Sequence, residues 1–134
     1  GGGGGSSSSS TAAALLALLD EDDAQLQALA LQKLDACVAV HWPEVFDAID
    51  KVETISEDAK NDAHELAALL ASKVYYHLGE QKDAMQFALA AGTLFDLADK
   101  SEYTNTVVAT CIDEYVQQRA AAREAAAAAP AAPA

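Results

Sequence analysis

Residues 69–92, LLASKVYYHLGEQKDAMQFALAAG, decide how the rest of the chain is interpreted. Apolar residues recur on both sides of Gly79 with the spacing of amphipathic helices. They are Leu66, Leu69, Leu70, Val74 and Leu78 before the glycine, and Ala84, Phe87, Ala88 and Ala91 after it. Gly79 lies where a helix end needs a residue that tolerates positive φ, and Gly92 repeats that signal one helix later. The stretch therefore predicts a helical hairpin whose two helices meet through small residues.

The composition favours the same class of structure. Ala and Leu dominate, and β-branched residues are few. Between a Gly/Ser start and an Ala-rich end lie roughly a hundred residues of ordinary complexity, enough for one modest core. We predict a flexible Gly/Ser/Ala-rich lead over residues 1–12, a helical segment over residues 13–119, and an Ala/Pro-rich tail over residues 120–134. The tail either extends the last helix until Pro130 or is disordered.

Outside the hairpin, local signals place the other helices. We expect them over residues 11–19, 24–40, 44–55 and 101–118, with the first hairpin helix starting after Asp62. Pro43 suits the first turn of its helix, Ser101 suits a cap, and Asp62 with Glu65 resembles a capping box. Residues 93–99 form one helical turn or a compact apolar loop. The side chains expected to be buried include Val45, Phe46, Ile49 and Val52 in one helix, and Val108, Cys111, Ile112 and Tyr115 in the last.

Two features allow more than one interpretation. The acidic run Asp20–Asp23 fits a helix N-terminus, where carboxylates accept free N–H groups, and it also fits an acidic docking patch. Trp42, at a helix junction, suits packing between two helices, and it is also the best candidate for an anchor that binds a partner. We favour the structural interpretation of both.

The charge balance excludes several classes of partner. The formal net charge is −13, and the eight Lys and Arg residues are scattered singly, which is unlike a nucleic-acid or anionic-membrane surface. The apolar run 12–19 is too short to span a bilayer. Cys37 and Cys111 lack a disulfide framework, so we expect reduced core thiols in a cytosolic or nuclear protein.

No pattern of reactive residues predicts an enzyme. Cys37 and His41 share a helix face, and His64, His77 and Cys111 lie elsewhere, but no paired metal-ligand spacing occurs. The sequence also lacks a GxSxG elbow and a phosphate-binding glycine loop. We therefore expect no catalytic, cofactor-binding or metal-binding residues, no cofactor and no small-molecule ligand.

The expected architecture is all-α, with antiparallel helical hairpins stacked as an irregular α-solenoid. The hairpin is tetratricopeptide-like, with Tyr75 and Tyr76 before the turn and Ala84 and Ala91 after it. Because this pattern does not recur at a fixed period, we do not expect a regular repeat array.

Five segments carry a resemblance to a known family. In order along the chain they are LLDEDDAQLQALALQKLD (18–35), HWPEVFDAIDKVE (41–53), LLASKVYYHLGE (69–80), FALAAGTLFD (87–96) and EYTNTVVATCIDEYV (102–116). Their order and spacing closely resemble the N-terminus of the family of non-ATPase regulatory subunit 1 of the 26S proteasome. That family supplies the large scaffold subunit in the base of the regulatory particle. The resemblance covers residues 15–118.

The resemblance implies a non-catalytic role. In that family an N-terminal helical rod leads into a toroid of repeats and a tail that docks a ubiquitin receptor. The quoted residues correspond only to the rod, so ubiquitin-receptor docking is not carried over to this chain. The implied function is a scaffold segment that supports assembly and ATP-dependent degradation of ubiquitinated proteins. The implied partners are base ATPases and lid subunits, in the cytoplasm and nucleus.

A free-standing helical-repeat adaptor, which binds peptides or partner helices, is the alternative. A solenoid fragment leaves an apolar face open, whereas a self-contained solenoid has polar caps. The last helix offers such a face in Val107, Val108, Cys111, Ile112 and Tyr115. We predict that the isolated chain self-associates or binds a hydrophobic dye. A monomer that does not bind the dye would favour the adaptor.

Overall fold

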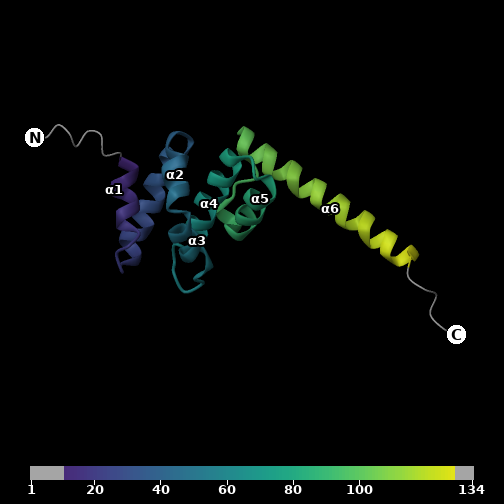
Figure 1. Cartoon of the computed structure of the whole chain (residues 1–134), viewed down its shortest axis with the longest axis horizontal. Helices are drawn as coiled ribbons and strands as arrows, with labels where there is room; N and C mark the ends of the chain where they lie inside the picture. Colours follow the sequence, from purple (N-terminus) through teal and green to yellow (C-terminus); the bar gives the residue numbers. More distant parts are fainter. Residues whose placement is uncertain (1–10, 129–134) are drawn as a thin grey trace, which may run out of the picture.

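The computed structural model describes residues 11–128, which form helices joined by turns (Figure 1). The helices are α1 (Thr11–Leu18), α2 (Ala24–Asp47), α3 (Ile49–Glu57), α4 (His64–Leu78), α5 (Gln81–Ala90) and α6 (Glu102–Ala128), with a short 3-10 helix η2 (Gly92–Leu94). No strand occurs among the described residues, and the all-α prediction is confirmed. The expectations for residues 1–10 and for Pro130 lie outside the described residues.

Helix α4 is the centre of the packed body. It contacts α2, α3 and α5, while α1 packs on α2 and α6 packs on α5. Small residues are buried where α4 meets α5: Ser72 Oγ of α4 donates to the Ala84 carbonyl of α5 at 2.6 Å, and Ala84 and Ala88 are buried. In Figure 1 the first part of α6 lies against the body and the rest projects away from it. The predicted solenoid stacking and the three-part division of the chain stay predictions.

The turn of the hairpin has the predicted backbone. Gly79 has φ +86° and Gly92 has φ +61°, in the left-handed region that favours glycine. The N–H groups of Gly79 and Glu80 donate to the carbonyl oxygens of Tyr76 and Tyr75. These bonds satisfy the last carbonyls of α4 and turn the chain into α5.

The region around Pro43 differs in part from expectation. His41 is non-helical (φ −104°, ψ 16°), and Pro43 follows in the first turn of the next helical stretch, as predicted. The predicted helix over residues 44–55 is wrong, because the chain turns at Ala48 and α3 starts at Ile49. This break turns α3 so that Ile49, Val52 and Ile55 enter the core, whereas Phe46 is 39% exposed rather than buried.

The start of α4 is a second correction. Asp62 is exposed, and Ala63 precedes the helix without a side-chain cap. The Asn61 side chain instead accepts a hydrogen bond from the N–H of Ala63 at 2.9 Å. Glu65 does not reach back to form a capping box, since its carboxylate lies beside Gly92, where an added Cβ would be 2.8 Å from Oε2. The side chain that accepts a backbone N–H before α4 is therefore Asn61, one residue earlier than the predicted Asp62.

Helix α6 begins as predicted and continues further. The Ser101 hydroxyl accepts the N–H of Thr104 at 3.2 Å, and the helix runs on to Ala128. The predicted burial of Ile112 and Tyr115 is wrong: the two side chains are 60% and 59% exposed. Helix α6 is still beside α5 here, since Lys82 Nζ lies 3.4 Å from Glu114 Oε2, but the Ile112 and Tyr115 side chains are left largely open to solvent.

Candidate functional site

The acidic run helps to hold the N-terminal helices together. The Asp23 carboxylate accepts the N–H groups of Gln25 and Leu26 at the start of α2. Asp20 Oδ2 lies 2.8 Å from Lys51 Nζ of α3. Two of the four carboxylates therefore cap a helix or join helices, in agreement with the structural interpretation. The docking-patch alternative stays a prediction for the exposed Glu21 and Asp22.

Trp42 lies between two helices. Its ring stacks on His77 of α4, with 6.2 Å between ring centroids and 8° between planes, and it packs against the core. Burial, reinforced by the nearby Lys73 cation, lowers the pKa of His77 below its usual value. The geometry fits the packing interpretation, and the partner-anchor alternative stays a prediction.

A polar cleft of about 320 Å³ opens between α2, α4 and the segment before α6. Lys73 Nζ lies 2.8 Å from Asp35 Oδ1 and 5.7 Å from the ring centroid of Tyr103. The Tyr103 hydroxyl is 2.7 Å from the buried Oγ of Ser72, which donates to the carbonyl of Ala84 at 2.6 Å. Burial raises the pKa of Tyr103 to about 12. The hydrogen bonds beside this cleft form a network that ties α4, α5 and α6 together.

This network does not have the features of an active site. Ser72 Oγ is held between Ala84 and Tyr103, and the neutral His77 ring is stacked on Trp42 rather than paired with a hydroxyl. A nucleophilic serine needs a base within hydrogen-bond reach. The observed partners of Ser72 instead make it a structural bridge.

The surroundings of His41, Cys37 and Cys111 do not favour metal binding. His41 Nδ1 pairs with Glu44 Oε2 at 3.0 Å, and Cys37 and Cys111 are free and half-buried. Burial raises the pKa of both thiols, which lowers the thiolate fraction that binds metals or attacks electrophiles. Residues 11–128 contain no group of three or more His, Cys, Asp or Glu arranged to hold a metal ion.

An apolar groove lies between α5, η2 with the segment after it, and α6. It has a volume of about 350 Å³ and is lined by Ala88, Leu89, Gly92, Phe95, Leu97, Val108, Cys111 and Ile112. Leu97 is 72% exposed and Leu89 is 61% exposed. We call this surface the apolar groove. Exposed apolar side chains that gather in one place mark contact sites on soluble proteins.

The sequence predicted only part of this groove. Ile112 and Tyr115 are exposed, as the open face of the last helix predicted, whereas Val108 and Cys111 are half-buried and Val107 is buried. Leu89 and Leu97 were missed. A signal for Leu89 was present in the sequence, because this large apolar residue lies outside the helical stripe of Ala84 and Ala88 that was predicted to be buried. None of the helices in residues 11–128 is both long and apolar enough to cross a membrane.

The fold and these surfaces define an all-α protein of packed helices that carries an open apolar groove within residues 11–128. Comparison with known sequences is more specific. A family model described as the N-terminal domain of 26S proteasome subunit RPN2 matches residues 10–133. The chain belongs to this family.

Curated relatives agree with the family. The chain is 48% identical over 101 residues to 26S proteasome non-ATPase regulatory subunit 1 of Drosophila melanogaster, covering 75% of this chain and 10% of the relative. It is 44% identical over 102 residues to the subunit of the same name from Dictyostelium discoideum, covering 75% and 10%. It is 41% identical over 102 residues to 26S proteasome regulatory subunit rpn2 of Schizosaccharomyces pombe, covering 76% and 11%. The chain thus spans about a tenth of the length of these relatives.

Proposed function

We propose that this chain acts as a non-catalytic scaffold segment of the proteasome regulatory particle. The observation that carries the proposal is the family match over residues 10–133, which includes all of the described helices. The relatives are named as regulatory, non-ATPase subunits, which fits a role without chemistry. The helical body supports the same role, because the side chains that line its polar cleft form structural pairs such as Lys73–Asp35 and are not arranged as a nucleophile and its base.

The proposal extends to the place of the segment in the particle. The scaffold belongs to the base of the regulatory particle, meets base ATPases and lid subunits, and supports assembly and ATP-dependent degradation of ubiquitinated proteins. Its compartments are the cytoplasm and the nucleus. The apolar groove and the exposed faces of α6 are the surfaces on which such contacts would form.

A segment exchange tests the proposal. This chain replaces the matching segment of the Drosophila relative, with which it shares 48% identity, and the chimera is expressed with an affinity tag in fly cells lacking the native subunit. We expect the chimera to enter 26S particles that degrade ubiquitinated protein. A matched negative control carries Leu34→Asp at a fully buried position of α2. A chimera that is folded and abundant but absent from the particles would overturn the proposal.

A further inference from the structure

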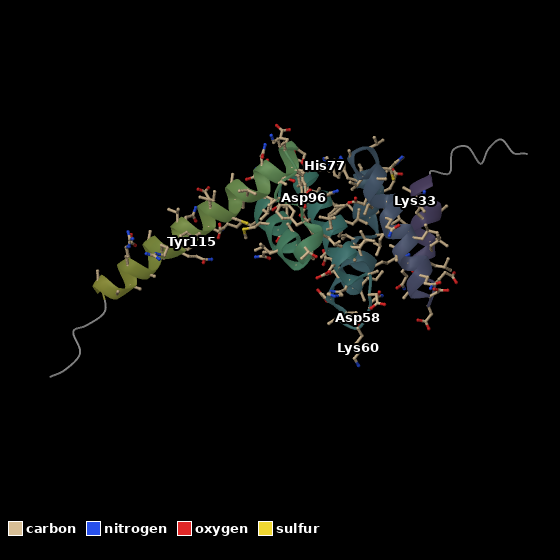
Figure 2. All side chains as sticks on the ribbon, turned by 180° about the vertical axis from the view of Figure 1, so that it is seen from behind. Lys33, Asp58, Lys60, His77, Asp96 and Tyr115 are labelled. Carbon is tan, nitrogen blue, oxygen red and sulfur yellow. The ribbon has the colours of Figure 1, made fainter. Side chains whose placement is uncertain are left out.

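The projecting half of α6, residues 115–128, has no neighbour among the described elements that could cover it. All of its side chains are exposed, including Tyr115 and Val116 (Figure 2 labels Tyr115 on this part of α6). A single helix of this length is only marginally stable in water without packing against a partner. The helix therefore gains stability if another surface covers it.

The surface that suits this helix is present in the same chain. Helix α6 carries Val108, Ile112 and Val116 at intervals of four residues, so one apolar line runs from the apolar groove onto the projecting half. Beyond Val116 the helix is mostly Ala, which allows the close approach of a second helix. A projecting half from a second copy has the small, apolar face that the groove of the first copy would accept.

The charges around these two surfaces are complementary. Arg119 and Arg123 are the only arginines of a chain with net charge −13, and both lie on the projecting half. Asp96 lies between two groove-lining residues, and Asp113 follows Ile112; both side chains are exposed. Within the described residues these four side chains form no ion pair with each other. If the projecting half of one copy lay beside the groove of another, the arginines of the first copy would come close to the aspartates of the second.

We propose that two copies of this chain form an antiparallel dimer in which each apolar groove receives the projecting half of α6 from the other copy. The contact is self-complementary, so it closes with two-fold symmetry instead of growing into a filament. Apolar burial supplies the affinity, and the Arg–Asp pairs set the antiparallel direction. The dimer would cover the same surfaces that the proposed function assigns to other proteasome subunits, so the two contacts would exclude one another.

The net charge limits the strength of this dimer. Two chains of charge −13 repel one another, which opposes their association. We therefore expect a reversible monomer–dimer equilibrium and not a permanent dimer. Sedimentation velocity of the full 134-residue chain over a wide concentration range measures it.

Matched variants locate the interface. The double variant Ile112→Asp/Val116→Asp changes two exposed side chains, so the helices should stay folded while the association constant falls by at least about tenfold. The control Val40→Asp changes an equally apolar side chain of α2, 74% exposed, and should leave association unchanged. Circular dichroism checks folding in each case.

Two further measurements test the direction of the pairing. Arg119→Glu/Arg123→Glu should weaken the dimer, and the addition of Asp96→Lys/Asp113→Lys should restore it. Alkylation of the native Cys111, which lines the groove, should slow on dimerisation, whereas that of Cys37 on α2 should not. A chain that stays monomeric at every concentration would overturn the proposal. So would equal weakening by Val40→Asp, or a Cys111 alkylation rate that does not change.

Discussion

Ser72 offers the sharpest test of how the helices are held together. Its side chain is fully buried where α4, α5 and α6 meet, with Oγ 2.6 Å from the Ala84 carbonyl oxygen and 2.7 Å from the Tyr103 hydroxyl. Since the Ser72 hydroxyl donates to Ala84, the Tyr103 hydroxyl donates to Ser72. The substitution Ser72→Ala removes both hydrogen bonds and little volume.

The expected loss follows from the groups left behind. One hydrogen bond contributes about 0.5–1.5 kcal/mol, and a buried polar group without its partner costs about 1–3 kcal/mol. The Ala84 carbonyl lies inside α5 and keeps its place in the helix ladder, so the largest cost falls on the Tyr103 hydroxyl. We expect Ser72→Ala to lower the free energy of unfolding by roughly 2 kcal/mol.

Tyr103→Phe removes one bond and leaves Ser72 donating to Ala84, so it should cost only about 1 kcal/mol. In the Ser72→Ala background the same change removes a hydroxyl that already lacks its partner, and its cost should be near zero. The two substitutions should therefore couple by about 1 kcal/mol. A pair of independent residues would show additive losses.

Urea unfolding followed by far-UV circular dichroism measures all four species of this cycle. The matched control is Ser56→Ala, because the Ser56 hydroxyl donates only to the Glu53 carbonyl within its own helix at 2.7 Å. That change should cost less than about 0.5 kcal/mol. If Ser72→Ala costs no more than Ser56→Ala, or if the cycle is additive, Ser72 does not bridge the helices.

Four other predictions concern stability and its pH dependence, each measured by urea unfolding. Gly79→Ala should cost about 1–2 kcal/mol from the φ of +86° alone, because no heavy atom lies within 4 Å of an added Cβ; a cost near zero would contradict this. Asp23→Ala should cost about 1 kcal/mol through loss of the α2 cap, and the control Asp22→Ala should cost less than half as much. The lowered pKa of His77 means that the unfolded chain takes up the proton first, so the wild type should lose stability as pH falls below 6.5 and His77→Gln should lose less. The pKa of Tyr103, raised from 10.0 to about 12, gives stability that is complete below pH 10 and lost as pH rises towards 12; identical alkaline curves for the wild type and Tyr103→Phe would refute this.

Local signals in the sequence were enough to locate most of the helices. Gly79 and Gly92 have the positive φ that their positions implied, and Ser101 caps α6 as expected. These features depend on a residue's own backbone preference or on a hydrogen bond to a neighbour a few positions away. The family resemblance was also contained in the sequence, because it rests on residue identity and order alone.

Other features depended on residues far apart in the chain. The turn at Ala48 and the choice of Asn61 over Asp62 carry no distinct local signal, since they follow from how α3 and α4 fit the core. The partnerships of Ser72 with Tyr103 and of Trp42 with His77 join positions about thirty residues apart, which helical periodicity does not specify.

The sequence by itself therefore determined that this chain is helical, where its hairpin turns, and to which family it belongs. The tertiary structure decided which apolar stripes are covered. The same periodicity predicted burial for Val74 and for Ile112, yet Val74 is fully buried while Ile112 is 60% exposed. Periodicity shows which face of a helix is apolar, but burial requires a second surface, and only the packing of the whole chain supplies one.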